Sequence, residues 1–166
     1  IISGYRTQSS QLLCDRAVAI IEADYADESL TLTDVSARLA VSPNYLSALI
    51  KKNKGENFVS LLTACRMRHA YDLIVCSTMK ILEVAERCGM SFSYFAKKFL
   101  AVYGKTCKEY IEEMRIIKAE EFLVFTDFDL QKISSETGFS DCSHMIKSFK
   151  KLRGITPKQY RIKLAE

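Results

Sequence analysis

The stretch LTDVSARLAVSPNYLSALIKKNKG, residues 32–55, recurs twice more along the chain in altered form. The second copy is ILEVAERCGMSFSYFAKKFLAVYG at 81–104, and the third is LQKISSETGFSDCSHMIKSFKKLRG at 130–154. The copies begin 49 residues apart, and the third carries one extra residue just after Ser140. Such a repeat indicates one structural unit used three times.

Each copy predicts two short helices joined by a tight turn. Apolar residues at i and i+3 favour a first helix, and a serine N-cap favours the start of a second. Ala40 replaces the turn glycine in the first copy, so that turn is expected to differ. The expected first helices are 32–39, 81–87 and 130–136, the turn glycines are Gly89 and Gly138, the N-caps are Ser42, Ser91 and Ser140, and the second helices are about 43–53, 92–102 and 141–152.

Longer helices are expected to lead into the first pair and to join successive pairs. Capping boxes at Thr106–Glu109 and Thr156–Gln159 mark two of their starts. No segment predicts a strand, so the fold class is all-α, with three tandem helix-turn-helix lobes. The longer helices are expected at about 10–25, 57–76, 106–125 and 157–164, and the domain boundaries at 1–10 (tail), 11–56, 57–105 and 106–166.

Composition places the chain among folded proteins. It has 166 residues, 48% of them hydrophobic and 27% charged, values that exclude a disordered chain. The longest uncharged run lies between Arg38 and Lys51, too short to cross a membrane. Because the chain begins at Ile1 rather than Met, we expect a fragment of a longer cytoplasmic protein, with any sensor domain preceding Ile1.

No catalytic or metal site is expected. The six cysteines form no C-x-x-C pair and are predicted to be reduced and mostly buried, and His69 and His144 are the only histidines. Gly104-Lys-Thr106 ends like a P-loop, but Phe99 stands where that motif needs glycine. We therefore predict that the protein is not an enzyme and takes no cofactor.

The net charge of +4 is unevenly distributed, with basic clusters in residues 43–54, 91–105 and 140–163. Recurring basic clusters favour a polyanionic partner, although lysine is also common at the solvated ends of helices. In a helix-turn-helix, the second helix enters the major groove of DNA. The coincidence of motif and charge therefore favours double-stranded DNA.

Ser42–Gly55, followed by Phe58, Arg66 and Ala70, resembles the first lobe and connecting helix of AraC/XylS-family transcription regulators. Gly138–Arg161 resembles the C-terminal signature of that family. The resemblance covers about residues 12–162. It implies an all-helical DNA-binding domain that works with RNA polymerase and can dimerise through an upstream domain.

The family domain has two lobes and one linker, so the third lobe is a departure. Lobes one and two, or lobes two and three, could form the family-like pair. The extra lobe could bind DNA, pack against the others or mediate dimerisation. Ile1–Tyr5 also resembles a segment of response-regulator receiver domains, and the lead-in helix with lobe one resembles the output domain of AraC-type response regulators.

The resemblance also implies which positions face DNA. Asn44 suits adenine, Lys97 and Lys147 suit guanine, and the remaining short side chains leave more of the specificity to DNA shape. The implied base-facing residues are Asn44, Ser47, Ala48, Ser93, Ala96, Lys97, Cys142, Ser143, Ile146 and Lys147. The phosphate candidates are Lys51, Lys52, Lys54, Lys98, Lys105, Lys150, Lys151, Arg153, Lys158 and Arg161.

Other positions favour structural roles. Arg66 and Arg115, at matched linker positions, are expected to pair within the protein rather than with phosphates. The helical spacing predicts core positions at Tyr45, Leu46, Leu49, Phe95, Phe99, Met145 and Phe149.

Two functional alternatives remain beside DNA binding. One is a helical protein-interaction module in which one or more lobes do not bind DNA. The other is a thiol sensor at Cys142, at the start of a recognition helix. Three engaged lobes predict a DNA site of about 30 base pairs, and two engaged lobes predict about 20.

Overall fold

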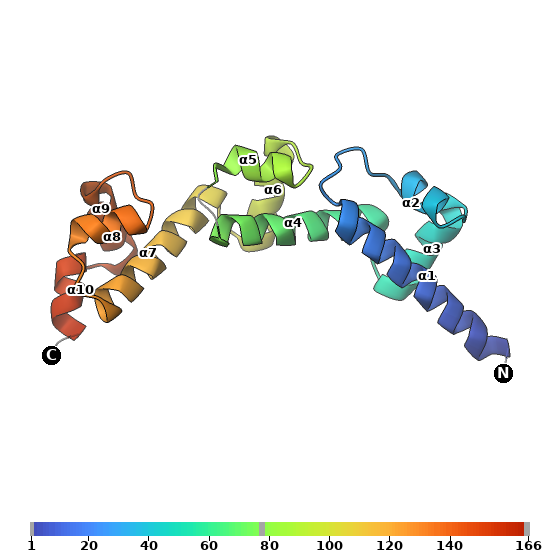
Figure 1. The fold of residues 1–166 in the computed structure, drawn as a ribbon, viewed down its shortest axis with the longest axis horizontal. Helices are drawn as coiled ribbons and strands as arrows, with labels where there is room; N and C mark the ends of the chain where they lie inside the picture. The colour runs from blue at the N-terminus through green and yellow to red at the C-terminus, as the bar shows by residue number, and fades with distance from the viewer. Residues whose placement is uncertain (1, 77–78, 165–166) are drawn as a thin grey trace. The chain divides into compact units, whose positions relative to one another are not determined.

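The computed structural model describes residues 2–76 and 79–164, with side chains for 9–75 and 79–164. Over these ranges the chain forms ten α-helices and no strand (Figure 1), which confirms the all-α class. The side chains behind the resemblance of Ile1–Tyr5 to receiver domains lie outside the described residues. The helices are α1 (Ile2–Asp24), α2 (Leu32–Arg38), α3 (Pro43–Lys54), α4 (Phe58–Cys76), α5 (Ile81–Arg87), α6 (Phe92–Tyr103), α7 (Cys107–Phe125), α8 (Leu130–Glu136), α9 (Cys142–Arg153) and α10 (Pro157–Leu164).

A seven-residue helix followed by a twelve-residue helix occurs three times in the described ranges. The pairs are α2 with α3, α5 with α6, and α8 with α9, and we call them lobes one, two and three. Their bounds lie within two residues of the predicted ones. The lead-in helix differs, because it begins at Ile2 where a tail over 1–10 was expected. No proline interrupts this segment, so nothing in it forbids the helix from extending.

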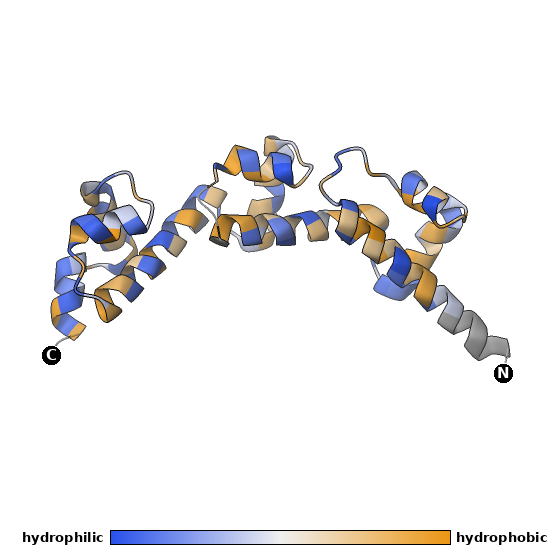
Figure 2. Ribbon diagram, viewed as in Figure 1, coloured by the Kyte–Doolittle hydropathy of each residue, from blue (hydrophilic) through white to orange (hydrophobic). Residues whose placement is uncertain are grey.

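The chain divides into two compact units, residues 1–98 and 99–166. In the first, α1 packs against α2, α3 and α4, and α4 also packs against α5. Hydrophobic and hydrophilic residues are interspersed along α1 and α4 (Figure 2). The apolar side chains that these helices bury form one cluster around lobe one. The largest of its fully buried members are Ile21, Val35, Leu46 and Ile50.

The second unit repeats this principle with different helices. Here α7 packs against α8, α9 and α10, and α10 also contacts α9. Its buried cluster takes Ile116 and Leu123 from the long helix, Ile133 from α8, and Met145 and Phe149 from α9. Short helices of seven and twelve residues are marginal alone, so burial against a long helix supplies most of their stability.

Six of the seven predicted core residues are buried as expected: Leu46, Leu49, Phe95, Phe99, Met145 and Phe149. The prediction for Tyr45 is wrong, because 50% of this residue is exposed. Successive helical positions differ by about 100° in direction. Tyr45 therefore lies about 100° around the helix from Leu46, at the edge of the face that buries Leu46, Leu49 and Ile50.

The turn inside each lobe is left-handed in all three lobes. Gly89 and Gly138 have φ of 63° and 76°, and Ala40 has φ of 55°. The expectation that the first turn differs is therefore wrong. Packing of α2 and α3 imposes this conformation on an alanine, which disfavours it.

The helix starts are capped largely as predicted. Ser42 and Ser91 accept hydrogen bonds from the backbone N–H groups three residues on. Ser140 was the wrong choice for the third cap, because Asp141 accepts from His144 N at 2.7 Å. The extra residue in the third copy moves the cap one position along, and Ser140 Oγ instead lies 3.1 Å from His144 Nδ1.

Two glycine substitutions are predicted to differ in their effects. A Cβ on Gly89 would lie 2.7 Å from the carbonyl oxygen of Ala26, whereas one on Gly138 would meet only the Arg115 side chain at 3.5 Å or more. Gly138→Ala is expected to lower the free energy of unfolding by about 1 kcal/mol through the positive φ alone. Gly89→Ala is expected to lower it by about 2–4 kcal/mol, because backbone must also shift. Denaturant unfolding followed by circular dichroism measures both, and equal losses would contradict the close packing at Gly89.

Candidate nucleic-acid interface

Each recognition helix is held at both ends by its own sequence. Pro43 occupies the first turn of α3, where its missing N–H is no loss. The twelve-residue helices end at glycines with φ between 70° and 76°, a conformation that closes a helix and favours glycine. These C-cap glycines are Gly55, Gly104 and Gly154.

One face of each recognition helix is buried and the opposite face is accessible. In α3 the buried face is Leu46, Leu49 and Ile50. Asn44, Ser47 and Ala48 lie on the other face, because positions i, i+3 and i+4 are neighbours on a helix. The same spacing holds in α6 and α9.

None of the ten predicted base-facing residues is buried. Asn44, Ala48, Ser93, Lys97, Ser143 and Lys147 are exposed, and Ser47, Ala96, Cys142 and Ile146 are partly exposed. Within α3 and α6 they share one side of the recognition helix, as do Ser143, Ile146 and Lys147 in α9. Cys142 does not, because it packs against the buried cluster of unit 2. Their contacts with bases stay a prediction.

The phosphate candidates fall into two groups. Lys51, Lys52, Lys150, Lys151 and Lys158 are exposed. The others interact within the protein. Lys54 Nζ lies 3.3 Å from Asp15 Oδ1, Lys98 lies over the Tyr94 ring at 5.5 Å, and Lys105 pairs with Glu113.

The two arginine candidates are held more firmly. Arg153 donates to both carboxylate oxygens of Glu120 on α7, at 2.6 and 2.8 Å. Arg161 donates to the carbonyl oxygens of Thr126 and Phe128, at 3.4 and 2.7 Å. Both side chains tie unit 2 together, so a phosphate contact by either would compete with an internal bond.

The three recognition helices differ in the chemistry that they expose. The last turn of α3 carries Lys51, Lys52 and Lys54, and that of α9 carries Lys150, Lys151 and Arg153, whereas that of α6 carries no basic residue. Instead, α6 exposes large apolar side chains, each at least 38% accessible: Phe92, Tyr94, Leu100 and Val102. The middle helix is thus the least basic of the three.

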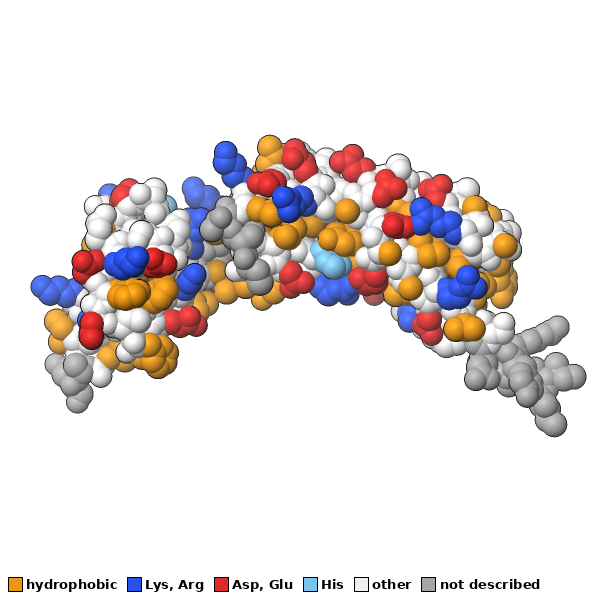
Figure 3. All heavy atoms as spheres, in the orientation of Figure 1, with side chains coloured by type: hydrophobic (Ala, Val, Ile, Leu, Met, Phe, Trp, Pro, Cys, Tyr) orange, Lys and Arg blue, Asp and Glu red, His pale blue; other side chains and the backbone are white. Residues whose placement is uncertain are grey.

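Charges of both signs meet on the surface. Figure 3 shows Lys and Arg side chains interspersed with Asp and Glu on the face that it draws, rather than one continuous basic sheet. A polyanion would be attracted by the basic clusters in the last turns of α3 and α9. That attraction would fall steeply with salt, because exposed charges are screened over about 10 Å at 0.1 M ionic strength.

Arg66 has the internal role that the sequence predicted. Its Nε donates to the carbonyl oxygen of Tyr25 at 2.8 Å, and Nη2 donates to that of Asp27 at 2.7 Å. The guanidinium thus joins α4 to the loop that follows α1. Arg115, one repeat later, lies 5.9 Å from the Phe139 ring centre and beside Gly138.

Most of the described thiols are poor candidates for reactivity. Cys14, Cys65, Cys88 and Cys107 are buried, whereas Cys142 is partly exposed. Burial raises the pKa of the Cys65 thiol to about 12 and those of Cys88 and Cys107 to about 11. At neutral pH these three are almost entirely protonated and weak nucleophiles.

Among the helices in the described ranges, none combines the length and the apolarity needed to span a membrane.

The sequence matches the helix-turn-helix domain family twice, over residues 35–106 and over residues 84–163. Each match takes in two lobes, and the shared segment 84–106 contains the whole of α6. Lobe two therefore fits the second position of one family-like pair and the first position of another.

Curated relatives are regulators of transcription or of porin expression. The porin thermoregulatory protein EnvY of Escherichia coli K12 is 33% identical over 102 residues, 61% of this chain and 40% of EnvY. The HTH-type transcriptional regulator GadX of Escherichia coli O6:H1 is 38% identical over 98 residues, 58% of this chain and 35% of GadX. The chain thus spans well under half the length of these relatives.

A solved structure also resembles part of this chain. The C-terminal domain of the two-component response regulator yesN from Fusobacterium nucleatum is 36% identical with a TM-score of 0.55. The alignment covers 97% of that domain but only 62% of this chain. The chain therefore extends beyond an entire domain of this kind.

Arg66→Ala is predicted to lower the free energy of unfolding by about 1–3 kcal/mol, because the partly buried carbonyl oxygen of Tyr25 and the exposed one of Asp27 lose a charged donor. Arg38→Ala is the matched control, since Arg38 pairs with Asp24 at the surface and its loss is expected to cost under about 1 kcal/mol. Chemical denaturation of both variants measures the difference. A loss for Arg66→Ala as small as the control would show that the two carbonyl contacts contribute little.

Proposed function

Because the chain belongs to the AraC-type helix-turn-helix family of transcription regulators, we propose that it binds specific duplex DNA sequences through three recognition helices, α3, α6 and α9, in successive major grooves. The observation that carries this proposal is the pair of overlapping family matches, 35–106 and 84–163. Together they cover all three lobes except the first three residues of α2. Each lobe with its preceding long helix, 11–56, 57–105 and 106–166, forms one recognition module.

Base recognition falls to the accessible face of each helix. The Asn44 amide donates to and accepts from adenine, and Lys97 and Lys147 donate to guanine O6 and N7. Ile146 contacts a thymine methyl group. Ser47, Ala48, Ser93, Ala96, Cys142 and Ser143 are short, so much of the specificity comes from the shape and deformability of the DNA.

Phosphate contacts position the helices on the duplex. The exposed pairs Lys51–Lys52 and Lys150–Lys151 lie near the C-terminal ends of α3 and α9, outside the base-facing segment. Lys158, at the start of α10, adds a further exposed charge in unit 2. Lysine–phosphate contacts fix the orientation of a protein on DNA and contribute no sequence preference of their own.

The remaining parts of the regulator follow from this role. The relatives are more than twice as long as the matched region, which leaves room for a sensor or dimerisation domain in the whole protein. We include RNA polymerase and a second copy of the protein among its partners. The site of action is the bacterial cytoplasm, where the DNA lies, and the role requires no catalysis.

One observation favours a second function for lobe two. The apolar side chains that α6 exposes suit a protein partner better than a phosphate backbone. In this alternative, lobes one and three bind DNA while lobe two contacts another protein. Substitution of Ser93 and Lys97 together distinguishes the two cases.

Neutralising lysine pairs tests the phosphate contacts. Lys51→Ala with Lys52→Ala, and separately Lys150→Ala with Lys151→Ala, are each expected to reduce the slope of log K against log salt by about 2, because each lost phosphate contact removes about 0.9. Lys108→Ala with Lys118→Ala, on the linker helix α7, is the control and leaves the slope unchanged. Fluorescence anisotropy with labelled duplex at several salt concentrations measures these slopes. Equal slopes for all three double variants would exclude the assigned contacts.

Selection of binding sites from random duplex DNA tests base recognition. Asn44→Ala is expected to erase the preference for adenine at one position, worth about 1–3 kcal/mol, while Gln131→Ala, exposed on α8, preserves the motif. Ser93→Ala with Lys97→Ala is expected to erase preferences in the middle of the site. Unchanged base preferences in the middle of the site would indicate that lobe two contacts another protein instead of DNA. No enriched motif, together with binding that ignores salt, would refute DNA recognition.

A further inference from the structure

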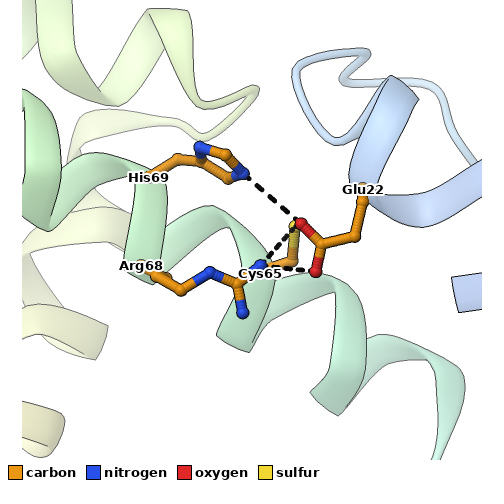
Figure 4. A network of polar contacts seen from close by, with 4 residues as sticks. All are labelled: Glu22, Cys65, Arg68 and His69. Atoms are coloured by element: carbon orange, nitrogen blue, oxygen red, sulfur yellow. Dashed lines mark hydrogen bonds and ion pairs between the residues drawn. The ribbon is translucent and has the colours of Figure 1, made fainter. Parts of the chain in front are cut away.

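A cluster of three metal-binding side chains lies in unit 1, on α1 and α4. Cys65 and His69 are four residues apart on α4, so they project from the same face of that helix. Glu22 reaches them from α1, which packs against α4 (Figure 4). Their ligand atoms all lie within 4.8 Å of one another.

We propose that Glu22 Oε2, Cys65 Sγ and His69 Nε2 form a binding site for a divalent transition-metal ion, with Zn²⁺ as the best fit. Glu22 Oε2 lies 3.3 Å from Cys65 Sγ and 3.5 Å from His69 Nε2. Ligand atoms bound tetrahedrally to zinc at about 2.0–2.3 Å are separated by about 3.5 Å. The two separations from Glu22 Oε2 therefore match those around one ion, and Cys65 Sγ and His69 Nε2 lie within 4.8 Å of each other.

Glu22 is oriented for this role by Arg68. The guanidinium binds Oε1, which leaves Oε2 directed at the cysteine and the histidine. Outer groups that orient a ligand in this way are common around metal sites.

His69 is placed by stacking. Its ring lies parallel to the Tyr25 ring, with 3.9 Å between ring centres and 3° between planes. Nε2 is buried and makes no hydrogen bond, although it lies 3.5 Å from Glu22 Oε2 and about one third of the side chain is exposed. A metal ion between this nitrogen and the carboxylate oxygen would bind both.

Cys65 supplies the thiolate. Binding forms an Sγ–metal bond and releases the thiol proton to solvent. The Cys65 thiolate and the Glu22 carboxylate together balance the 2+ charge of the ion. A fourth coordination position of the ion remains for water.

The repeat itself does not require this cluster. One repeat later, the residues at the positions of Glu22, Cys65 and His69 are Tyr71, Met114 and Lys118. By contrast, Arg66 and Ala70 recur as Arg115 and Ala119. The repeat thus keeps Arg66 and Ala70, whereas the three ligands have no counterparts one repeat later.

Cobalt titration of the reduced, metal-free chain tests the site, because Co²⁺ bound to a thiolate gives a charge-transfer band. The wild-type protein and Cys142→Ser, the matched cysteine control, are expected to develop this band at one equivalent of metal and to lose it when Zn²⁺ is added. Cys65→Ser is expected to lack the band. His69→Gln and Glu22→Gln are expected to bind Co²⁺ at least tenfold more weakly.

Circular dichroism checks that each variant is folded, and His69→Gln carries the test if Cys65→Ser unfolds, because His69 is partly exposed. A thermal scan adds a second readout, since an ion that binds only the folded state raises Tm. Zn²⁺ is expected to raise Tm of the wild type and of Cys142→Ser, but not of His69→Gln. Absence of the band in the wild type, or a band of equal strength in all variants, would overturn the proposal.

Discussion

A helix-turn-helix lobe of seven plus twelve residues can bury its apolar face only against a longer helix. In unit 1 this support comes from α1 and α4, and in unit 2 from α7, while the eight-residue α10 packs against both α7 and α9. The constraint fixes which side of each recognition helix is covered, and thereby which side is left for DNA. Lobe one shows the strength of this packing, because it holds even Ala40 in the left-handed conformation.

The lobes share a backbone plan and differ in surface chemistry. Lysines lie in the last turns of α3 and α9, the recognition helices of lobes one and three, whereas α6 exposes apolar side chains. The basic residues of unit 2 have two different roles. Arg153 and Arg161 make hydrogen bonds within the unit, whereas Lys150 and Lys151 face solvent. The proposed phosphate contacts therefore rest on lysines that face solvent.

Helix positions and most of the core could be predicted from sequence, because a 49-residue repeat shows the same apolar spacing three times. Local rules failed where one residue changed the geometry, as when Asp141 replaced Ser140 as the cap. Pairings across long separations, such as Glu120 with Arg153, leave no local signal. The same holds for Glu22 with Cys65 and His69: a count of two histidines argued against a metal site, while the contact between α1 and α4 brings the ligands together.

If all three lobes bind one DNA site, as we propose, they protect a longer stretch of duplex than two lobes would. Hydroxyl-radical footprinting of the intact chain on its selected sequence measures the length of that stretch. We expect protection over about 30 base pairs, in segments repeating at about one helical turn. Protection confined to about 20 base pairs would contradict it, because one lobe would then lie off the DNA.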